Sequence, residues 1–209
     1  TIVEKRLDAD YQPGAQMLGS GSLVTESQPL RELPPYEGNP ADLREDFLPE
    51  DVVGDPTIQR WLTVVDSRGR LRSGYKGTEN PASHTLHLVS QDSPSEYLAF
   101  LRNENIPYLV SGQGHVNLAA ALEKMRAKLG VETVVAEGGG KLSGALLREG
   151  LVDEVNLIFR PELIGGARTP TLFDAPDLTP EQSPTRLEFV ESHIQADGFV
   201  WLRYKTIPA

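Results

Sequence analysis

A run of consecutive glycines beside a carboxylate is the most informative group of residues in this sequence. Glu137 ends an apolar, β-branched stretch, Gly138–Gly140 follow it, and Lys141 and Leu142 begin a pattern typical of a helix. A glycine-rich turn lets backbone N–H groups approach an anion, and a helix N-terminus adds about half a positive charge. The segment therefore predicts a seat for a phosphate or pyrophosphate group.

The spacing of this turn separates it from two common nucleotide-binding motifs. A GxGxxG motif would need glycine where Ser143 stands, and a P-loop would need Ser or Thr where Leu142 stands. Two alternatives stay open from the residues alone. The glycines could form a tight strand-to-helix turn without a ligand, and Glu137 could be a solvated carboxylate at a strand end. Open α/β sheets, however, bind their ligands at this end of their strands.

Two further segments follow predicted strands and could take part in the same chemistry. Arg68, Arg70 and Arg72 follow the strand that ends at Asp66 and form a positive patch in an acidic protein. Such a patch could hold a phosphate monoester, for instance the 2′-phosphate of NADPH, or could be an exposed turn. The small residues Gly19–Ser22 also follow a strand, and their alternative is a plain loop.

Composition excludes several other classes of function. The chain has 209 residues, a formal net charge of −10 and no cysteine, which excludes disulfide scaffolds and thiol chemistry. The acidic excess argues against nucleic acid and membrane surfaces as partners. His84 and His87 would point to opposite faces of a strand, so we expect no metal site. Apolar runs are short, and a soluble protein is expected.

The elements that must position these residues alternate along the middle of the chain. Helices are predicted to begin at Ser93, as a capping residue, at Asn117 and after the glycine turn. Strands are predicted at 62–66, 85–90, 108–111 and 133–137, the last of them buried on both faces. This alternation is typical of a parallel α/β sheet.

The two ends of the chain differ from this middle part. Residues 1–10 are typical of a surface helix, and 31–56 hold eight acids and five prolines, which predicts an irregular, solvated loop. A long strand is expected over 154–163, and a hairpin over 187–207 turning at Asp197-Gly198. We expect one domain over 1–209. The chain opens at Thr1 inside a helix, so we expect its true N-terminus to be missing.

These features resemble the riboflavin-biosynthesis pyrimidine reductases, the RibD C-terminal domain family within the dihydrofolate-reductase-like fold. Two of the family's segments, its LDSRGR strand end and its GSGTV segment, are similar to Leu62–Arg70 and to Leu18–Ser22 with Pro29-Leu30. The order and spacing of its EGGG, GLVDE and P-x-x-x-GG motifs are similar to those of Glu137–Leu142, Gly150–Glu154, Pro161 and Gly165-Gly166.

The resemblance implies a mixed, mostly parallel sheet flanked by helices, with a C-terminal antiparallel hairpin. It implies a cytoplasmic homodimer that uses NADPH to reduce a small molecule, 5-amino-6-(5-phosphoribosylamino)uracil. Glu137 would act catalytically, by orienting the substrate or assisting proton delivery. The cofactor would contact Gly19, Ser22, Ser67, Arg68, Gly138, Gly139, Gly140, Lys141 and Leu142.

Some expectations stay open even with this resemblance. The family's first strand, with an S-L-D-G motif, would lie before Thr1. The same fold could reduce a different small substrate with NADPH. From another class, the chain could be a nucleotide-binding protein without catalytic activity.

Overall fold

A computed structural model describes residues 2–25, 27, 29–76, 82–166, 169–195 and 198–207 of the chain. The chain divides into two compact units, and each is described by itself below. One unit comprises residues 7–138, and the other comprises residues 1–6 together with 139–209.

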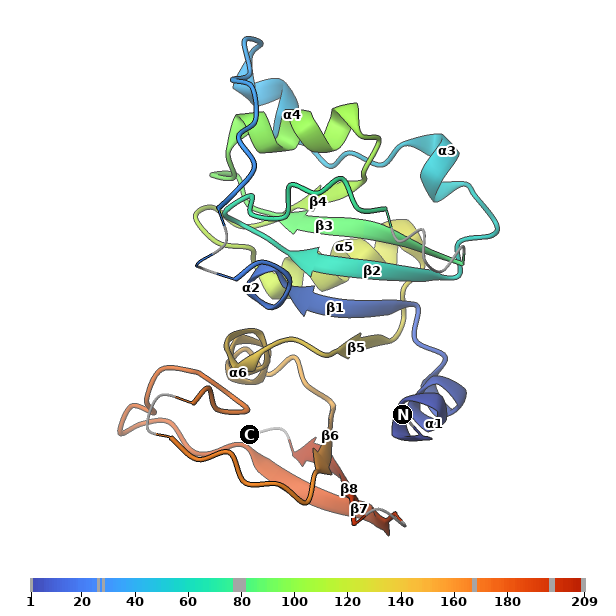
Figure 1. Cartoon of the computed structure of the whole chain (residues 1–209), viewed down its shortest axis with the longest axis vertical. Helices are drawn as coiled ribbons and strands as arrows, with labels where there is room; N and C mark the ends of the chain where they lie inside the picture. The colour runs from blue at the N-terminus through green and yellow to red at the C-terminus, as the bar shows by residue number, and fades with distance from the viewer. Residues whose placement is uncertain are drawn as a thin grey trace. The chain divides into compact units, whose positions relative to one another are not determined.

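The unit of residues 7–138 is built on a five-stranded sheet with the order β4-β3-β2-β1-β5. Every pairing in it is parallel, which confirms the prediction of a parallel α/β sheet. In the view of Figure 1, α5 covers the face behind the strands. The helix α1 (Ile2–Tyr11) is divided between the two units at residue 7. The other elements of this unit are β1 (Ala15–Gly19), α2 (Ser20–Leu23), a 3-10 turn (Pro40–Leu43), α3 (Glu50–Val53), β2 (Arg60–Val65), β3 (Ser83–Val89), α4 (Ser95–Asn103), β4 (Tyr108–Val110), α5 (Leu118–Leu129) and β5 (Val134–Ala136).

The register of β1 aligns the carboxyl ends of its two neighbours. Gly19 lies opposite Val65 of β2, and Met17 lies opposite Ala136 of β5. The residues that follow these strands therefore meet at one edge of the sheet. The prediction that 133–137 is buried on both faces is wrong, because β5 is an edge strand of this sheet and its residues are half-buried or exposed.

The prediction of an irregular, solvated loop over 31–56 holds for most of the segment, but part of the segment packs on the core. Leu43 is buried, and Phe47 packs against the same cluster as Leu98 and Leu101. The backbone of Phe47 also pairs with that of Tyr108 in an antiparallel bridge. Apolar side chains interspersed among the acids and prolines thus anchor an otherwise irregular segment.

Of the two residues predicted to cap helices, one does so and the other does not. Asn117 caps α5 as predicted, its side chain accepting from the N–H of Ala120 at 2.9 Å, and Gly130 ends that helix with φ of +65°. Ser93 does not cap α4. Its buried hydroxyl accepts from the N–H of Ser90 and donates to the carbonyl of Ser67, both at 3.0 Å.

The other unit contains α6 (Gly140–Arg148) and an antiparallel sheet of β6 (Glu154–Phe159), β8 (Val200–Ile207) and β7 (Arg186–Ile194). The predicted hairpin is confirmed as the pair β7 and β8; Asp197 of its turn lies outside the described residues. The predicted strand over 154–163 ends at Phe159, because Pro161 cannot donate to a ladder.

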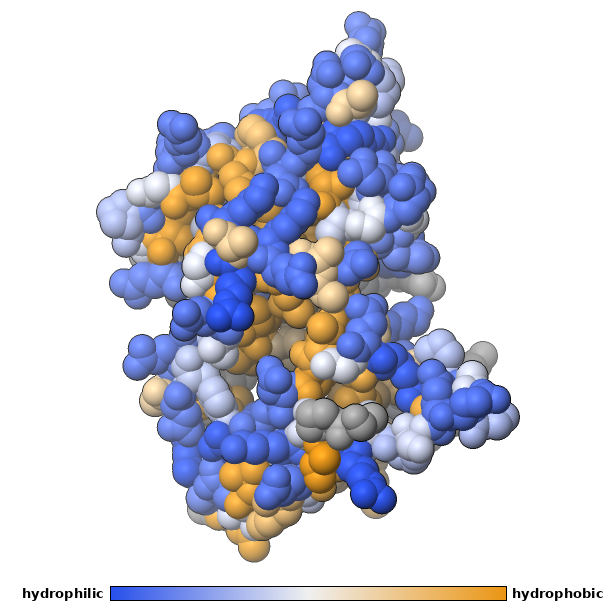
Figure 2. Space-filling model, turned by 180° about the vertical axis from the view of Figure 1, so that it is seen from behind, coloured by the Kyte–Doolittle hydropathy of each residue, from blue (hydrophilic) through white to orange (hydrophobic). Residues whose placement is uncertain are grey.

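The two faces of this antiparallel sheet differ in character. On one face, Arg203 donates to Glu154 and to Glu191. Phe189 belongs to the opposite face, where it contacts Tyr204 across the strands and is 56 % exposed. Hydrophobic residues that reach the surface appear as patches among hydrophilic ones in Figure 2. No helix among the described residues is long and apolar enough to cross a membrane.

Asp46 joins the 31–56 segment to β4 and α5, and this contact yields a prediction. Its carboxylate, 8 % exposed, accepts from Lys128, Lys124 and the N–H of Val110. Burial alone would raise the pKa of Asp46, but these hydrogen bonds outweigh it and lower the pKa. The stabilisation is therefore present at neutral pH and is lost as the pH falls through this lowered pKa.

We expect Asp46→Asn to lower the free energy of unfolding at pH 7 by about 1 to 3 kcal/mol, because hydrogen bonds to a charged acceptor are lost. Urea unfolding at pH 7 and at acidic pH measures it. The exposed Glu45 provides a control, and Glu45→Gln should change little. A deficit of Asp46→Asn that persists unchanged in acid contradicts the assignment.

Candidate functional site

Glu137 lies at the carboxyl end of β5, on the sheet edge where the ends of β1 and β2 also lie. Its N–H donates to the carbonyl of Met17 at 3.0 Å, and its Oε2 accepts from Nε2 of Gln16 at 2.6 Å. The residue is exposed. Sequence reasoning missed Gln16, whose place beside Glu137 depends on the pairing of β1 with β5. The result is a solvent-facing carboxylate with one side-chain hydrogen bond, from Gln16.

The glycine turn leads from Gly138 into the first turn of α6. Among the described residues no side chain caps this helix, Gly139 occupies the N-cap position, and the first turn contains no acidic residue. Its backbone N–H groups therefore suit an anion. Lys141 is exposed, and Leu142 is buried and anchors the helix.

Gly140 also has a packing role within its own unit. A Cβ atom there would clash with the carbonyl oxygen of Thr171 and the carboxylate of Asp174. Hydrogen bonds from the side chain and the N–H of Thr171 lower the pKa of Asp174, so a negative charge stands close to the start of α6. These contacts favour the alternative of a tight packing turn at Gly140, because a charged carboxylate beside it would repel an anion.

The three arginines after β2 do not form the predicted patch. Arg70 is buried, and its Nη2 donates to the carbonyl of Val24 at 2.7 Å. Arg72 donates from Nε to the carbonyl of Gly69 at 2.7 Å. The exposed guanidinium of Arg68 contacts no hydrogen-bonding partner among the described residues. Backbone carbonyls thus engage two of the cations, and the third, Arg68, is exposed to solvent.

The backbone around Arg68 is fixed on both sides. The N–H of Val116 donates to Oγ of Ser67 at 3.0 Å, and the hydroxyl of Ser93 donates to the Ser67 carbonyl. Oδ2 of Asp66 accepts from the N–H groups of Arg70 and Leu71, at 2.7 and 2.8 Å. Sequence reasoning did not use Asp66, although an aspartate at the start of a turn is a known signal for such bonds.

Gly19 and Ser22 lie beside this turn in the same unit. Gly19 ends β1 and precedes the single helical turn of α2, so the alternative of a plain loop over Gly19–Ser22 does not hold there. Ser22 is exposed. The helix ends at Leu23. The carbonyl of the next residue, Val24, accepts a hydrogen bond from Arg70, and this contact joins the end of α2 to the turn after β2.

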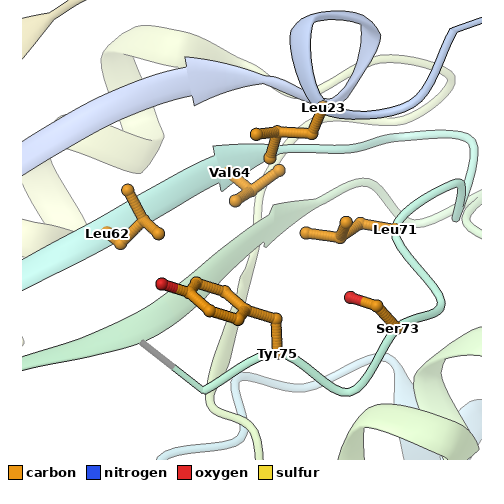
Figure 3. A pocket seen from close by; sticks show the side chains of 6 residues that line it. All are labelled: Leu23, Leu62, Val64, Leu71, Ser73 and Tyr75. Carbon is orange, nitrogen blue, oxygen red and sulfur yellow. The ribbon is translucent and has the colours of Figure 1, made fainter. Parts of the chain in front are cut away.

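An apolar pocket of about 460 Å³ lies between α2, β2 and the chain after Arg70; its lining residues are Leu23, Leu62, Val64, Leu71, Ser73 and Tyr75. Leu62 and Val64 are alternate residues of β2 and therefore share one face of the sheet. In Figure 3 the hydroxyl of Tyr75 points toward Leu62. The sequence analysis did not single out these residues, because apolar side chains on a strand are read as core.

The two histidines of β3 have different surroundings. His84 contacts the carbonyl of Thr85 through Nδ1, and His87 is buried in the core. Within the described ranges no group of three His, Asp or Glu side chains could hold a metal ion.

The chain is similar to a known family and to named relatives in other organisms. The family model described as RibD C-terminal domain matches residues 9–200. The chain is 31% identical over 137 residues to the 2,5-diamino-6-ribosylamino-4(3H)-pyrimidinone 5′-phosphate reductase of Methanothermobacter thermautotrophicus, covering 66% of this chain and 62% of that protein. The reductase of the same name from Archaeoglobus fulgidus is 31% identical over 160 residues, covering 77% of this chain and 67% of that protein.

A solved structure shows the same fold. A pyrimidine reductase-like protein from Corynebacterium diphtheriae matches with a TM-score of 0.63 and 20% identity, over 97% of this chain and 82% of that one. The mixed α/β architecture expected from the sequence, a parallel sheet with helices and a C-terminal antiparallel hairpin, is thereby confirmed.

The different environments of Arg70 and Arg68 give a prediction about stability. Arg70→Met should lower the free energy of unfolding by about 1 to 3 kcal/mol, because the buried carbonyl of Val24 loses its donor. Arg68→Met should change it by less than about 0.5 kcal/mol, as surface substitutions usually do. Chemical denaturation of both variants measures the contrast, and equal losses would contradict the assigned roles.

Proposed function

The chain belongs to the RibD C-terminal domain family, and from this premise we propose that it is an NADPH-dependent reductase of riboflavin biosynthesis. The observation that carries the cofactor assignment is Arg68, an exposed guanidinium on a turn whose backbone is held by Asp66, Ser67 and Ser93. An arginine in this setting suits a phosphate monoester, which NADPH has on its adenosine ribose and NADH lacks.

Within the unit of residues 7–138, the residues present suit one part of NADPH, its 2′-phosphate. In the unit of residues 7–138, Arg68 would hold the 2′-phosphate, and Ser67, Ser22 and Gly19 would contact the cofactor. For Gly138–Leu142, contact with the cofactor stays a prediction from the sequence, and the proposal made here depends on Arg68 and the residues around it. NADPH, when bound, supplies the hydride.

The side chains of this protein would align the reactants and manage the proton. Glu137, held by Gln16, would orient the substrate or assist delivery of the proton that accompanies the hydride. The apolar pocket beside β2 would suit an uncharged ring and keep water away from it. No covalent nucleophile is needed, because the cofactor carries the reducing equivalents.

The substrate we propose is a phosphoribosylamino-pyrimidine, reduced at the ribose to a ribitylamino product. The resemblance in the sequence points to 5-amino-6-(5-phosphoribosylamino)uracil. The archaeal relatives are named for the 2,5-diamino-pyrimidinone compound, which makes this the second candidate. The chain spans 62% of the first of these relatives, so activity on either compound belongs to the proposal.

We also propose that the protein is a homodimer. The exposed apolar residues of the antiparallel sheet, among them Phe159, Leu187 and Phe189, support a protein contact on that face. The mass of the full chain in solution, measured by sedimentation, decides between monomer and dimer.

The cofactor assignment predicts a preference between nucleotides. The protein should bind NADPH at least about tenfold more tightly than NADH. A charge-assisted hydrogen bond contributes roughly 1.4 kcal/mol or more, which corresponds to a tenfold change in Kd. Arg68→Met should abolish the preference by weakening NADPH alone, whereas Arg126→Met, at an exposed arginine of α5, should retain it. Quenching of tryptophan fluorescence in separate titrations measures both constants. Equal affinity of the unmodified protein for the two nucleotides would remove Arg68 from the cofactor site.

The role of Glu137 predicts a loss of turnover without a loss of cofactor binding. Glu137→Gln should lower kcat by roughly 10²-fold or more, the usual contribution of a proton-transferring group, and leave the Kd of NADPH unchanged. Glu132→Gln, at an exposed residue just before β5, is the matched control. Steady-state rates with both candidate substrates provide the measurement. If kcat of Glu137→Gln equals that of the control, Glu137 is not catalytic.

A further inference from the structure

Beneath the turn that presents Arg68 lies a line of buried polar side chains that the proposed chemistry does not use. Nδ1 of His87 on β3 is 2.7 Å from the hydroxyl of Tyr97 on α4, and that hydroxyl donates to Oδ2 of Asp66 at 3.0 Å. Their exposures are 1 % for His87, 0 % for Tyr97 and 1 % for Asp66. The rings of His87 and Tyr97 meet edge to face.

The hydrogen bonds fix one protonation pattern along this line. The single hydroxyl proton of Tyr97 is directed to Asp66, so the oxygen of Tyr97 must accept from His87, and Nδ1 of His87 carries a proton. Burial lowers the pKa of His87 to about 4 and raises that of Tyr97 well above its ordinary value. Both rings are therefore uncharged at neutral pH, and the line ends at an acceptor oxygen of Asp66.

Asp66 connects Tyr97 to the backbone of the turn that carries Arg68. The same Oδ2 atom that accepts from Tyr97 also accepts from the N–H groups of Arg70 and Leu71. Gly69 has φ of +63°, and a Cβ atom there would lie 2.7 Å from Cγ of Tyr97, so the turn rests directly on the tyrosine ring. The contacts of Asp66 and Tyr97 thus hold the backbone conformation of the turn around Arg68.

We propose that Tyr97 and Asp66 are positioning residues for the cofactor preference, because they hold the turn in the shape in which Arg68 meets a 2′-phosphate. This inference rests on the proposed function. A turn that is already ordered loses less conformational entropy when it binds a ligand. The effect should be confined to NADPH, since the contact that the turn supports is absent from NADH.

The test uses two tyrosines that differ in what their hydroxyl groups contact. Tyr97→Phe removes the hydroxyl and retains the ring under Gly69. Tyr108→Phe is the matched control, because Tyr108 is also 0 % exposed and its hydroxyl donates to the carbonyl of Leu43 at 2.9 Å and accepts from Arg102, away from the turn. We expect Tyr97→Phe to weaken NADPH binding roughly three- to tenfold and to leave NADH binding within about twofold.

A second readout requires no nucleotide. Hydrogen exchange of the Arg70 and Leu71 amides should be faster in Tyr97→Phe and unchanged in Tyr108→Phe, while the two variants melt at similar temperatures. The inference is overturned if these amides exchange as in the unmodified protein, or if both variants keep its ratio of NADPH to NADH affinity. Should the unmodified protein bind neither nucleotide, the proposed function fails and the exchange rates still decide whether Tyr97 orders the turn.

Discussion

The candidate site depends on one constraint, the parallel register that β1 makes with β2 and β5. Gly19 is level with Val65, and Met17 with Ala136, so three strands end at the same edge of one sheet. Because side chains that follow parallel strands share this edge, Glu137 and Asp66 belong to one region although 70 sequence positions lie between them. A shift of either pairing by one residue would turn these side chains to the other face.

At this edge, the polar groups with internal partners differ in role from those exposed to solvent. Asp66, Arg70 and Ser93 are buried, and each satisfies backbone groups that would otherwise be left unpaired, at a cost of about 1 to 3 kcal/mol each. Arg68, in the turn after β2, and Glu137, directly after β5, are exposed. The buried groups hold the backbone in place, and in the proposed function the exposed groups contact phosphate and substrate.

Much of this fold could be predicted from local signals. The alternation of strands and helices, the Asn117 cap and the C-terminal hairpin depend on residues close together in the chain, and the structure confirms each of them. The failures depend on contacts between distant residues. Ser93 binds Ser67 instead of capping a helix, and Arg70 binds Val24, so their partners are invisible to a local pattern. The assignments of Glu137 and the glycine turn to the active site stay predictions.

The central claim is that this chain transfers a hydride to a phosphoribosylamino-pyrimidine. The most direct measurement follows the full chain with NADPH deuterated at the transferred position and either of the two candidate substrates, with mass spectrometry of the product. The account predicts a ribitylamino product that carries the deuterium, formed in proportion to the NADPH consumed. A protein that binds NADPH and leaves both pyrimidines unchanged would contradict it.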